Sequence, residues 1–370
     1  MGSKDLHIQP FDKGTLAKLS IFEDYAEAWI PTFVMISEPE IHIFDLFAGP
    51  GYDFNEEPGS PIRILKKINL FLFDILLRKT KIVLHLNEFE PNKTSQKKFE
   101  LLKINCDKFC QDNPKLKYFL TIEYYNERAE SLFFKFLPTI SKFPSLVFLD
   151  QNGIKFISKE YIIALEKLTK VDFLFFVSSS YFKRLGMTEE FRRVLNFDFD
   201  ELERENYKNI HRLVLNKIKS SISPISDLKL FPFSIKKGAN IFGIIFGAKH
   251  YLAVDKFLSI AWQRNNMNGE ADFDIDDDLC KGQLNLFTSK AMTKIERFQA
   301  ELECNLMNGT LKTNKDVLIF TYTNGHIPTH ASVVLKKLKG IKLTYESRSP
   351  YITYENVFRK NNIISYNLLK

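Results

Sequence analysis

The feature that most constrains this chain is a short apolar run that leads directly into a glycine turn. Residues 41–46 (IHIFDL) are mainly β-branched and aromatic, which predicts a buried strand. Gly49 and Gly51 follow, and glycine can adopt positive φ while leaving room for a ligand against the backbone. A helix is predicted next, with Ser60 as its N-cap and Pro61 at its first position. Together these elements indicate the first unit of a nucleotide-binding α/β sheet.

The spacing of glycines and acids narrows the choice of nucleotide. A dinucleotide fingerprint needs a third glycine where Asp53 and Phe54 stand, and the next predicted strand ends in an acid only at Glu88. The phosphate-binding sequence G-K-[ST] does not occur in the chain. The pattern D-x-F-x-G-x-G at residues 45–51 instead resembles motif I of class I S-adenosylmethionine-dependent methyltransferases, in the variant common among enzymes that methylate nucleic acids. An ordinary glycine turn after a buried strand is the alternative.

Further along the chain, predicted strands alternate with predicted helices. This alternation predicts a parallel sheet with right-handed crossovers. The apolar runs 231–235 and 241–247 flank a Lys-Lys-Gly turn and predict the antiparallel pair with which class I methyltransferase sheets end. We therefore expect an α/β fold with a class I methyltransferase-like (Rossmann-type) seven-stranded sheet and a helical insertion at about 188–228. The expected strands before the pair are 41–46, 81–86, 118–124, 145–149 and 172–178, and the expected helices are 14–33, 62–77, 94–109, 130–137, 161–168 and 255–263.

Length and charge predict a second domain. A chain of 370 residues suggests two domains, which we place at 1–290 and 291–370. The second range holds twelve Lys or Arg against six Asp or Glu, so it carries +6 of the formal net charge of +7. Helices expected at 292–307, 315–322 and 328–339, followed by strands at 341–345 and 351–354, predict a winged helix.

The basic residues of this second domain predict a nucleic-acid partner. Lys336, Lys337 and Lys339 lie on the third expected helix and Arg348 lies on the expected wing. In a winged helix both elements contact the duplex, so these side chains are expected to bind phosphates of DNA or RNA. A solvated helix face, or a docking surface for a partner protein, is the alternative.

Metal, disulfide and membrane functions are not expected. His326 and His330 have helical spacing, but no third ligand lies near them in the sequence, so no metal site is predicted. The acidic run 270–278 lacks the Gly and Glu of a calcium loop and is interpreted as a solvated linker. The four cysteines, Cys106, Cys110, Cys280 and Cys304, form no regular framework, and no run approaches 18 apolar residues. We expect a cytoplasmic protein with reduced thiols and no membrane partner.

The order of several short motifs resembles that of the three-Cys-motif partner protein family, TcmP, of bacteria and phages. The motifs are the helix residues 25–29 (YAEAW), 45–51 (DLFAGPG), 59–61 (GSP), 87–88 (NE), 148–153 (FLDQNG), the segment 231–263 and 327–330 (IPTH) before 333–335. The resemblance covers nearly the whole chain. It implies a class I methyltransferase-like domain, a C-terminal winged helix, and a partner. That partner is the three-Cys-motif protein, which is radical-S-adenosylmethionine-like and binds an iron–sulfur cluster.

The candidate cofactor residues follow the ends of the first three strands. Asp45 and the glycine turn are expected to bind the methionine portion of S-adenosylmethionine, with the carboxylate facing its ammonium group. Glu88 is expected to accept both ribose hydroxyls, because a carboxylate at a strand end can accept two parallel hydrogen bonds. Asn126 or Glu127 is expected to bind the adenine amino group. The full candidate set is Asp45, Phe47, Gly49, Pro50, Gly51, Glu88, Asn126 and Glu127.

The candidate catalytic residues, Asp150, Gln151 and Asn152, follow the fourth strand. Relatives typically have Asp-Pro-Phe-Gly here, and amino-methyltransferases have (Asp/Asn)-Pro-Pro-(Tyr/Phe), which holds an amine and stacks a flipped base. This chain has neither the proline nor the aromatic residue, so Phe156 is the candidate for stacking. No Pro-Cys pair occurs, which excludes cytosine-C5 chemistry. Two hypotheses stay open: a methyltransferase acting on nucleic acid or protein, and a degenerate cofactor-binding adaptor that recruits nucleic acid and the partner.

Overall fold

The computed structural model describes residues 10–91, 97–151, 156, 158–178, 207–238, 240–281 and 292–369. Contacts divide the chain into two compact units, Met1–Lys249 and His250–Lys370, and each is described by itself. The predicted domain boundary at 290 is a sequence-based division that this grouping does not test. The helical insertion predicted at 188–228 falls partly outside the described residues; its described part contains η3 (Tyr207–Asn209) and α10 (Ile210–Ser221).

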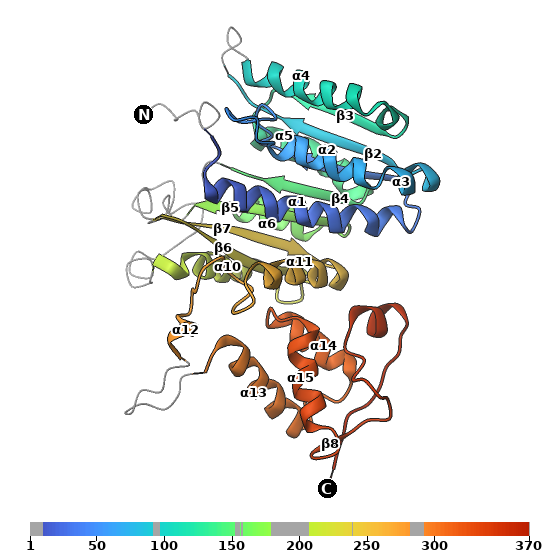
Figure 1. Cartoon of the computed structure of the whole chain (residues 1–370), viewed down its shortest axis with the longest axis vertical. Coiled ribbons are helices and arrows are strands. Elements are labelled where there is room, and N and C mark those ends of the chain that lie inside the picture. Colours follow the sequence, from blue (N-terminus) through green and yellow to red (C-terminus); the bar gives the residue numbers. More distant parts are fainter. Residues whose placement is uncertain are drawn as a thin grey trace. The chain divides into compact units, whose positions relative to one another are not determined.

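The first unit is built on a seven-stranded sheet in the order β3-β2-β1-β4-β5-β7-β6 (Figure 1). The first five strands pair in parallel, and β7 runs antiparallel to both of its neighbours, β5 and β6. The predicted seven-stranded sheet, parallel up to an antiparallel ending, is therefore confirmed. The strands are β1 (Glu40–Asp45), β2 (Lys81–Asn87), β3 (Leu120–Tyr125), β4 (Ser145–Leu149), β5 (Val171–Ser178), β6 (Lys229–Lys237) and β7 (Asn240–Ala248).

Helices connect the parallel strands and cover both faces of the sheet. In Figure 1, α1 and α2 cross the face that is turned toward the viewer. The first helix is capped by Asp12, whose carboxylate accepts a hydrogen bond from the N–H of Thr15. The helices of this unit are α1 (Lys13–Val34), α2 (Ser60–Leu70), α3 (Leu72–Arg78), α4 (Lys97–Asp112), η1 (Pro114–Tyr118), α5 (Ala129–Lys142) and α6 (Lys159–Glu166), followed by η3 and α10.

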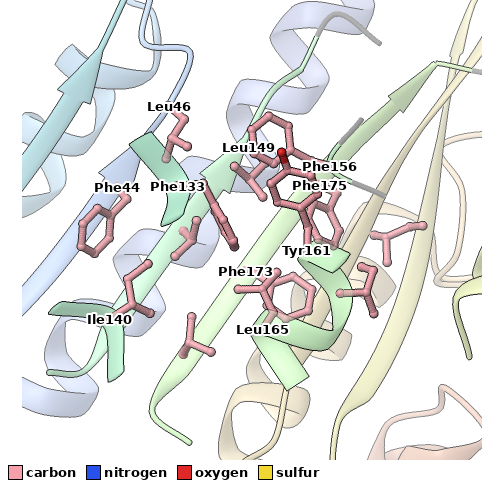
Figure 2. Close-up of a cluster of buried hydrophobic side chains, with 14 of the residues drawn as sticks. Phe44, Leu46, Phe133, Ile140, Leu149, Phe156, Tyr161, Leu165, Phe173 and Phe175 are labelled. Carbon is pink, nitrogen blue, oxygen red and sulfur yellow. The ribbon is translucent and has the colours of Figure 1, made fainter. Parts of the chain in front are cut away.

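Alternation along the strands divides the buried side chains between the two faces. Phe44, Leu149, Phe173 and Phe175 point to one face, where they pack with side chains of α5, α6 and α10 (Figure 2). Neighbouring residues point the other way, toward α1. Phe148 stacks on Phe22 with ring centroids 3.9 Å apart. The Tyr25 hydroxyl of α1 donates a 2.7 Å hydrogen bond to Asp172 of β5. The sheet is thus buried on both faces, as its apolar strands require.

The structure corrects two predictions about the helix after the glycine turn. Ser60 does not cap it, since Gly59 is the N-cap and Ser60 already lies within the helix. The Ser60 hydroxyl lies beside Asp45 instead. The predicted single helix over 62–77 is also two helices, because the backbone leaves helical geometry at Phe71, between α2 and α3.

The second unit, His250–Lys370, is mainly helical. Its elements are α11 (Tyr251–Arg264), α12 (Asp278–Lys281), α13 (Lys294–Met307), α14 (Asn314–Thr323), α15 (Pro328–Leu338), β8 (Leu343–Thr344), a π-helical turn η4 (Glu355–Arg359) and β9 (Asn367–Leu368). Both α13 and α14 begin with a capping box, formed by Thr293 with Glu296 and by Thr313 with Asp316. The three helices predicted after residue 291 are therefore present.

The predicted wing is wrong in its pairing. Residues 351–354 were expected to pair with 341–345, but Leu343–Thr344 pairs with Asn367–Leu368, and the turn η4 follows Tyr354. Asn314 of α14 holds the chain here, since its Nδ2 donates to the carbonyls of Tyr351 and Asn362. Tyr351 has φ +49°, which lies outside strand geometry, so the predicted strand does not begin there. In the described part of the chain, no helix is both long and apolar enough to cross a membrane.

Close packing around Gly247 of β7 gives a test of the sheet. An added Cβ there would lie 2.1 Å from the ring of Phe173 on β5, with which Gly247 pairs. Gly247→Ala should therefore lower the free energy of unfolding by about 1–3 kcal/mol. The control Ile225→Ala changes a side chain that is 92% exposed and should alter it by less than about 0.5 kcal/mol. Denaturant unfolding measures both, and equal stability of the two variants would contradict this packing.

Candidate functional site

The carboxyl ends of β1, β2 and β3 are held together by the side chain of Asn87. This residue is 1% exposed. Its Nδ2 donates to the carbonyl of Leu46 (3.0 Å), and its Oδ1 accepts from the N–H of Glu127 (3.1 Å). Its own carbonyl accepts from the N–H of Ala48 (2.9 Å). Parallel strands place their carboxyl ends at one edge, and Asn87 fixes the loops that leave that edge.

The glycine turn lies at this edge in a conformation that requires glycine. Gly49 has φ +67° and Gly51 has φ +98°. A Cβ on Gly51 would also come within 3.2 Å of Asn105 on α4, whose Nδ2 donates to the carbonyl of Pro50 (2.7 Å). The N–H of Gly49 donates to Oε2 of Glu88 (3.0 Å). The structure thus brings Gly49, Pro50, Gly51 and Glu88 together, as their positions after the strands predicted.

Asp45 is a buried carboxyl group at the end of β1. It is 0% exposed, and its Oδ1 accepts from the N–H of Phe47 (3.1 Å). No described residue donates a hydrogen bond to its buried Oδ2. Burial raises the pKa of Asp45 to about 7; the Ser60 hydroxyl and the Phe47 N–H oppose this shift, and the charges of Asp150 and Glu88 add to it. The group is therefore poised to lose its proton when a cation arrives.

The residues after β3 differ in what they can offer a ligand. Oδ1 of Asn126 accepts from the N–H of Glu90 (2.9 Å), while its buried Nδ2 has no partner in the described structure. Glu127 instead turns its carboxylate to Lys135 of α5. The geometry thus favours Asn126, as a donor, over Glu127. Phe89 follows Glu88 directly and is 39% exposed. It is not among the residues predicted from the sequence, where the one available signal was an aromatic residue directly after the acid that ends the strand.

Two of the aromatic candidates turn out to belong to the core. Phe47 is half-buried, and its ring packs edge-on against Phe156 with centroids 5.8 Å apart, so it meets the site mainly through its backbone. Phe156 is 1% exposed and also packs against Phe133 and Tyr161. The prediction that Phe156 could stack on a substrate is therefore wrong, because its ring is buried and already packs against Phe133 and Tyr161.

The end of β4 carries a contact that the sequence did not indicate. Asp150 forms an ion pair with Lys18 of α1, and the Lys18 side chain is only 9% exposed. The Lys18 ammonium also lies 4.4 Å from the ring centroid of Phe176 on β5. Gln151 is 4% exposed, and its Oε1 accepts from the N–H of Phe156 (2.9 Å). Asn152 lies outside the described residues.

The basic residues of the second unit do not form one uniform surface. Lys336 and Lys337 are exposed in the last turn of α15, and Arg348 is exposed in the segment before residue 351. Lys339 is used internally: its Nζ donates to the carbonyl of Ser347 (2.7 Å) and lies 4.3 Å from the ring centroid of Tyr345. Lys336, Lys337 and Arg348 are thus the exposed members of the predicted phosphate-binding set.

The histidine pair of the second unit is a packed hydrogen-bonded pair. Nδ1 of His326 lies 3.0 Å from Nδ1 of His330, and both rings pack against Trp262. Burial lowers the pKa of His326 to about 2 and that of His330 to about 4, with the Lys294 charge adding to both shifts. Within the described ranges, no three His, Cys, Asp or Glu residues are grouped so that they could hold a metal ion.

Comparisons with known proteins give weak similarities. No family model matches the chain, and no curated protein matches it. Among solved structures, Trm1 from Pyrococcus horikoshii in complex with S-adenosyl-L-methionine is 14% identical, with TM-score 0.35, over 70% of this chain and 61% of Trm1. The O-methyltransferase TomG from Streptomyces achromogenes, involved in tomaymycin synthesis and in complex with SAM, is 11% identical, with TM-score 0.32, over 66% of this chain and 92% of TomG. Both TM-scores are below 0.5, which is too low to assign a fold from the similarity alone.

The raised pKa of Asp45 predicts a pH dependence of stability. In the folded protein Asp45 keeps its proton up to about pH 7, whereas in the unfolded chain it loses its proton near the ordinary aspartate pKa of 3.8. Relative to Asp45→Asn, the free energy of unfolding should fall by about 1.4 kcal/mol per pH unit between these values and level off above them. Denaturant titrations from pH 4 to 8 measure this. Asp74→Asn on α3 should keep the parent slope, and a parent slope in Asp45→Asn would refute the assignment.

Proposed function

We propose that the unit Met1–Lys249 binds S-adenosylmethionine at the carboxyl edge of its sheet and acts as a methyltransferase. The observation that carries this proposal is the buried Oδ2 of Asp45, which no described residue pairs and which lies beside the glycine turn. A buried carboxylate is stabilised by a cation that enters with the ligand. S-adenosylmethionine brings two cationic groups, an ammonium and a sulfonium.

The remaining groups at the edge fit the other parts of the same molecule. Glu88, held at the turn by the Gly49 N–H, presents carboxylate lone pairs for ribose hydroxyls. The unpaired Nδ2 of Asn126 is a donor and suits a ring nitrogen of adenine rather than the adenine amino group. Phe89 adds an exposed aromatic ring next to Glu88. One ligand thus satisfies an acceptor and a donor that are otherwise buried without partners.

Methyl transfer is assigned to the end of β4. When bound, S-adenosylmethionine supplies an electrophilic methyl group, and Asp150 with Gln151 would hold the acceptor. Asn152 is included in this proposed set only because it follows Gln151 in the sequence. The second candidate is the adaptor, favoured by the ion pair that commits one oxygen of Asp150 to Lys18. An adaptor would bind the cofactor but move no labelled methyl group to nucleic acid or to a partner protein, which separates the two.

We further propose that the chain acts with a three-Cys-motif protein, as a TcmP family member. The support is the motif order that the sequence carries, together with the fit of its Asp-Leu-Phe-Ala-Gly-Pro-Gly and Asn-Glu motifs to one sheet edge. The substrate proposed for this pair is nucleic acid, held through the second unit, for which a winged-helix role remains part of the proposal.

Cofactor binding is the direct test. Calorimetry with S-adenosylmethionine or S-adenosylhomocysteine should give micromolar binding, about −8 kcal/mol. Glu88→Ala should weaken it by about tenfold to a hundredfold, because a carboxylate that accepts two hydroxyls is lost.

Glu100→Ala is the matched control for that experiment. Its carboxylate pairs with Lys103 on the surface of α4, so the variant should bind like the parent. Unchanged affinity in Glu88→Ala and in Asp45→Ala would remove the proposed cofactor site.

Nucleic-acid binding is tested through the exposed lysines of α15. A face that binds phosphates releases counterions, so binding to duplex DNA or structured RNA should fall steeply with salt. Lys336→Glu/Lys337→Glu should flatten that dependence while cofactor affinity stays the same. The control Arg359→Glu/Lys360→Glu changes exposed cations that pair with Glu355 and should keep the parent slope. Fluorescence anisotropy over a salt series measures both, and equal slopes in the two double variants would refute the assignment.

A further inference from the structure

The residues at the end of β4 offer hydrogen-bond donors where an amine would need acceptors. The Oε1 atom of Gln151 already accepts a hydrogen bond from the N–H of Phe156. Its Nε2 is buried, and none of the described residues accepts a hydrogen bond from it. An amide donor that is 4% exposed and unpaired is costly, so a ligand that accepts its hydrogen bond is favoured.

Lys18 places a second donor at the same strand end. Its ammonium pairs with Oδ2 of Asp150, which follows β4 directly, and its side chain is largely removed from water. The ring of Phe176 lies against the ammonium and keeps it at this position. An ammonium has three N–H groups, and one hydrogen bond to Asp150 leaves donors for a ligand. The pairing also places a positive charge beside Asp150, which opposes the approach of a second cation.

We propose that this strand end recognises the methyl acceptor through an oxygen atom, a carboxylate or a hydroxyl group, with Lys18 and Gln151 as the specificity-determining donors. The assignment rests on the proposed methyltransferase function. A neutral amine would bring N–H donors to a strand end where the unpaired Nε2 of Gln151 and the remaining N–H groups of Lys18 are themselves donors. An oxygen atom of the acceptor would instead accept hydrogen bonds from both. In the transfer, an O–CH3 bond would form as the S–CH3 bond breaks, and S-adenosylhomocysteine would leave. A carboxylate acceptor would have no proton to lose, and a hydroxyl acceptor would give its proton to the Asp150 carboxylate.

The test uses two small probes that share one ring and differ in the reacting group. Benzoate presents a carboxylate, and aniline presents an amine that is neutral at pH 7. Ligand-observed NMR titrations of the full chain at pH 7, without and with S-adenosylhomocysteine, should show benzoate bound more tightly than aniline. Lys18→Met and Gln151→Glu should each weaken benzoate binding by about tenfold or more, because each removes a buried donor. Lys18→Arg keeps the charge and should restore most of the binding.

Gln151→Glu makes the test robust to misfolding. It keeps the oxygen that accepts from Phe156 and replaces only the Nε2 donor by an acceptor, so preference should move from benzoate toward aniline. Lys237→Met is the matched control, since Lys237 lies 5.3 Å from the ring centroid of Phe242 and pairs with Asp12 rather than Asp150. It should bind benzoate as the parent does.

The outcomes separate this inference from the proposed function. Preference for aniline in the parent, binding of neither probe, or equal effects of Lys18→Met and Lys237→Met would overturn the inference while cofactor binding stands. If calorimetry shows that the parent protein does not bind S-adenosylhomocysteine, the proposed function is refuted instead. The preference between the two probes can still be measured, because the titrations are also done without S-adenosylhomocysteine.

Discussion

The candidate site depends on one buried amide. Asn87 donates to the carbonyl of Leu46 after β1 and accepts from the N–H of Glu127 after β3, so three adjacent strand ends share one side chain. The Asn87 side chain is 1% exposed, and leaving its amide without hydrogen bonds would cost free energy of folding. The loops after β1 and β3 are therefore held where both hydrogen bonds of the amide can form. The glycine turn, Glu88 and Asn126 lie in the loops that directly follow these strand ends. The positions of these groups at the sheet edge therefore depend on the hydrogen bonds of Asn87.

Local patterns in the sequence were enough to predict the sheet and to place half of the candidate site residues at one of its edges. Apolar runs of strand length, each followed by a glycine or an acid, placed Asp45, Gly49, Gly51 and Glu88 at one edge, because parallel strands end on the same side. The strand pairing in the second unit, where a wing was expected, could not be predicted from local patterns. Leu343–Thr344 pairs with Asn367–Leu368 across an intervening π-helical turn, and nothing local marks a strand of two residues.

The other half of the site rests on contacts between distant parts of the chain. Lys18 and Asp150 are 132 positions apart and meet only because α1 packs on the face of the sheet that holds Phe148. Nothing in the spacing around Lys18 distinguishes it from the other lysines of a basic chain. A lysine on the apolar side of an amphipathic helix was the one available signal, since burial of its charge requires a partner.

The part of the sheet edge at β1 and β2 differs in charge from the part at β4. At β1 and β2, the carboxyl groups of Asp45 and Glu88 form an acidic side, and burial with neighbouring charge raises the pKa of Asp45 to about 7, so that an approaching cation favours its ionised form. At β4, Lys18 neutralises Asp150 and Gln151 adds an unpaired donor. A cationic ligand is favoured on the first side and a hydrogen-bond-accepting one on the second. Under the proposed function, a methyl donor with a sulfonium centre would meet the first side and an oxygen atom of the acceptor would meet the second.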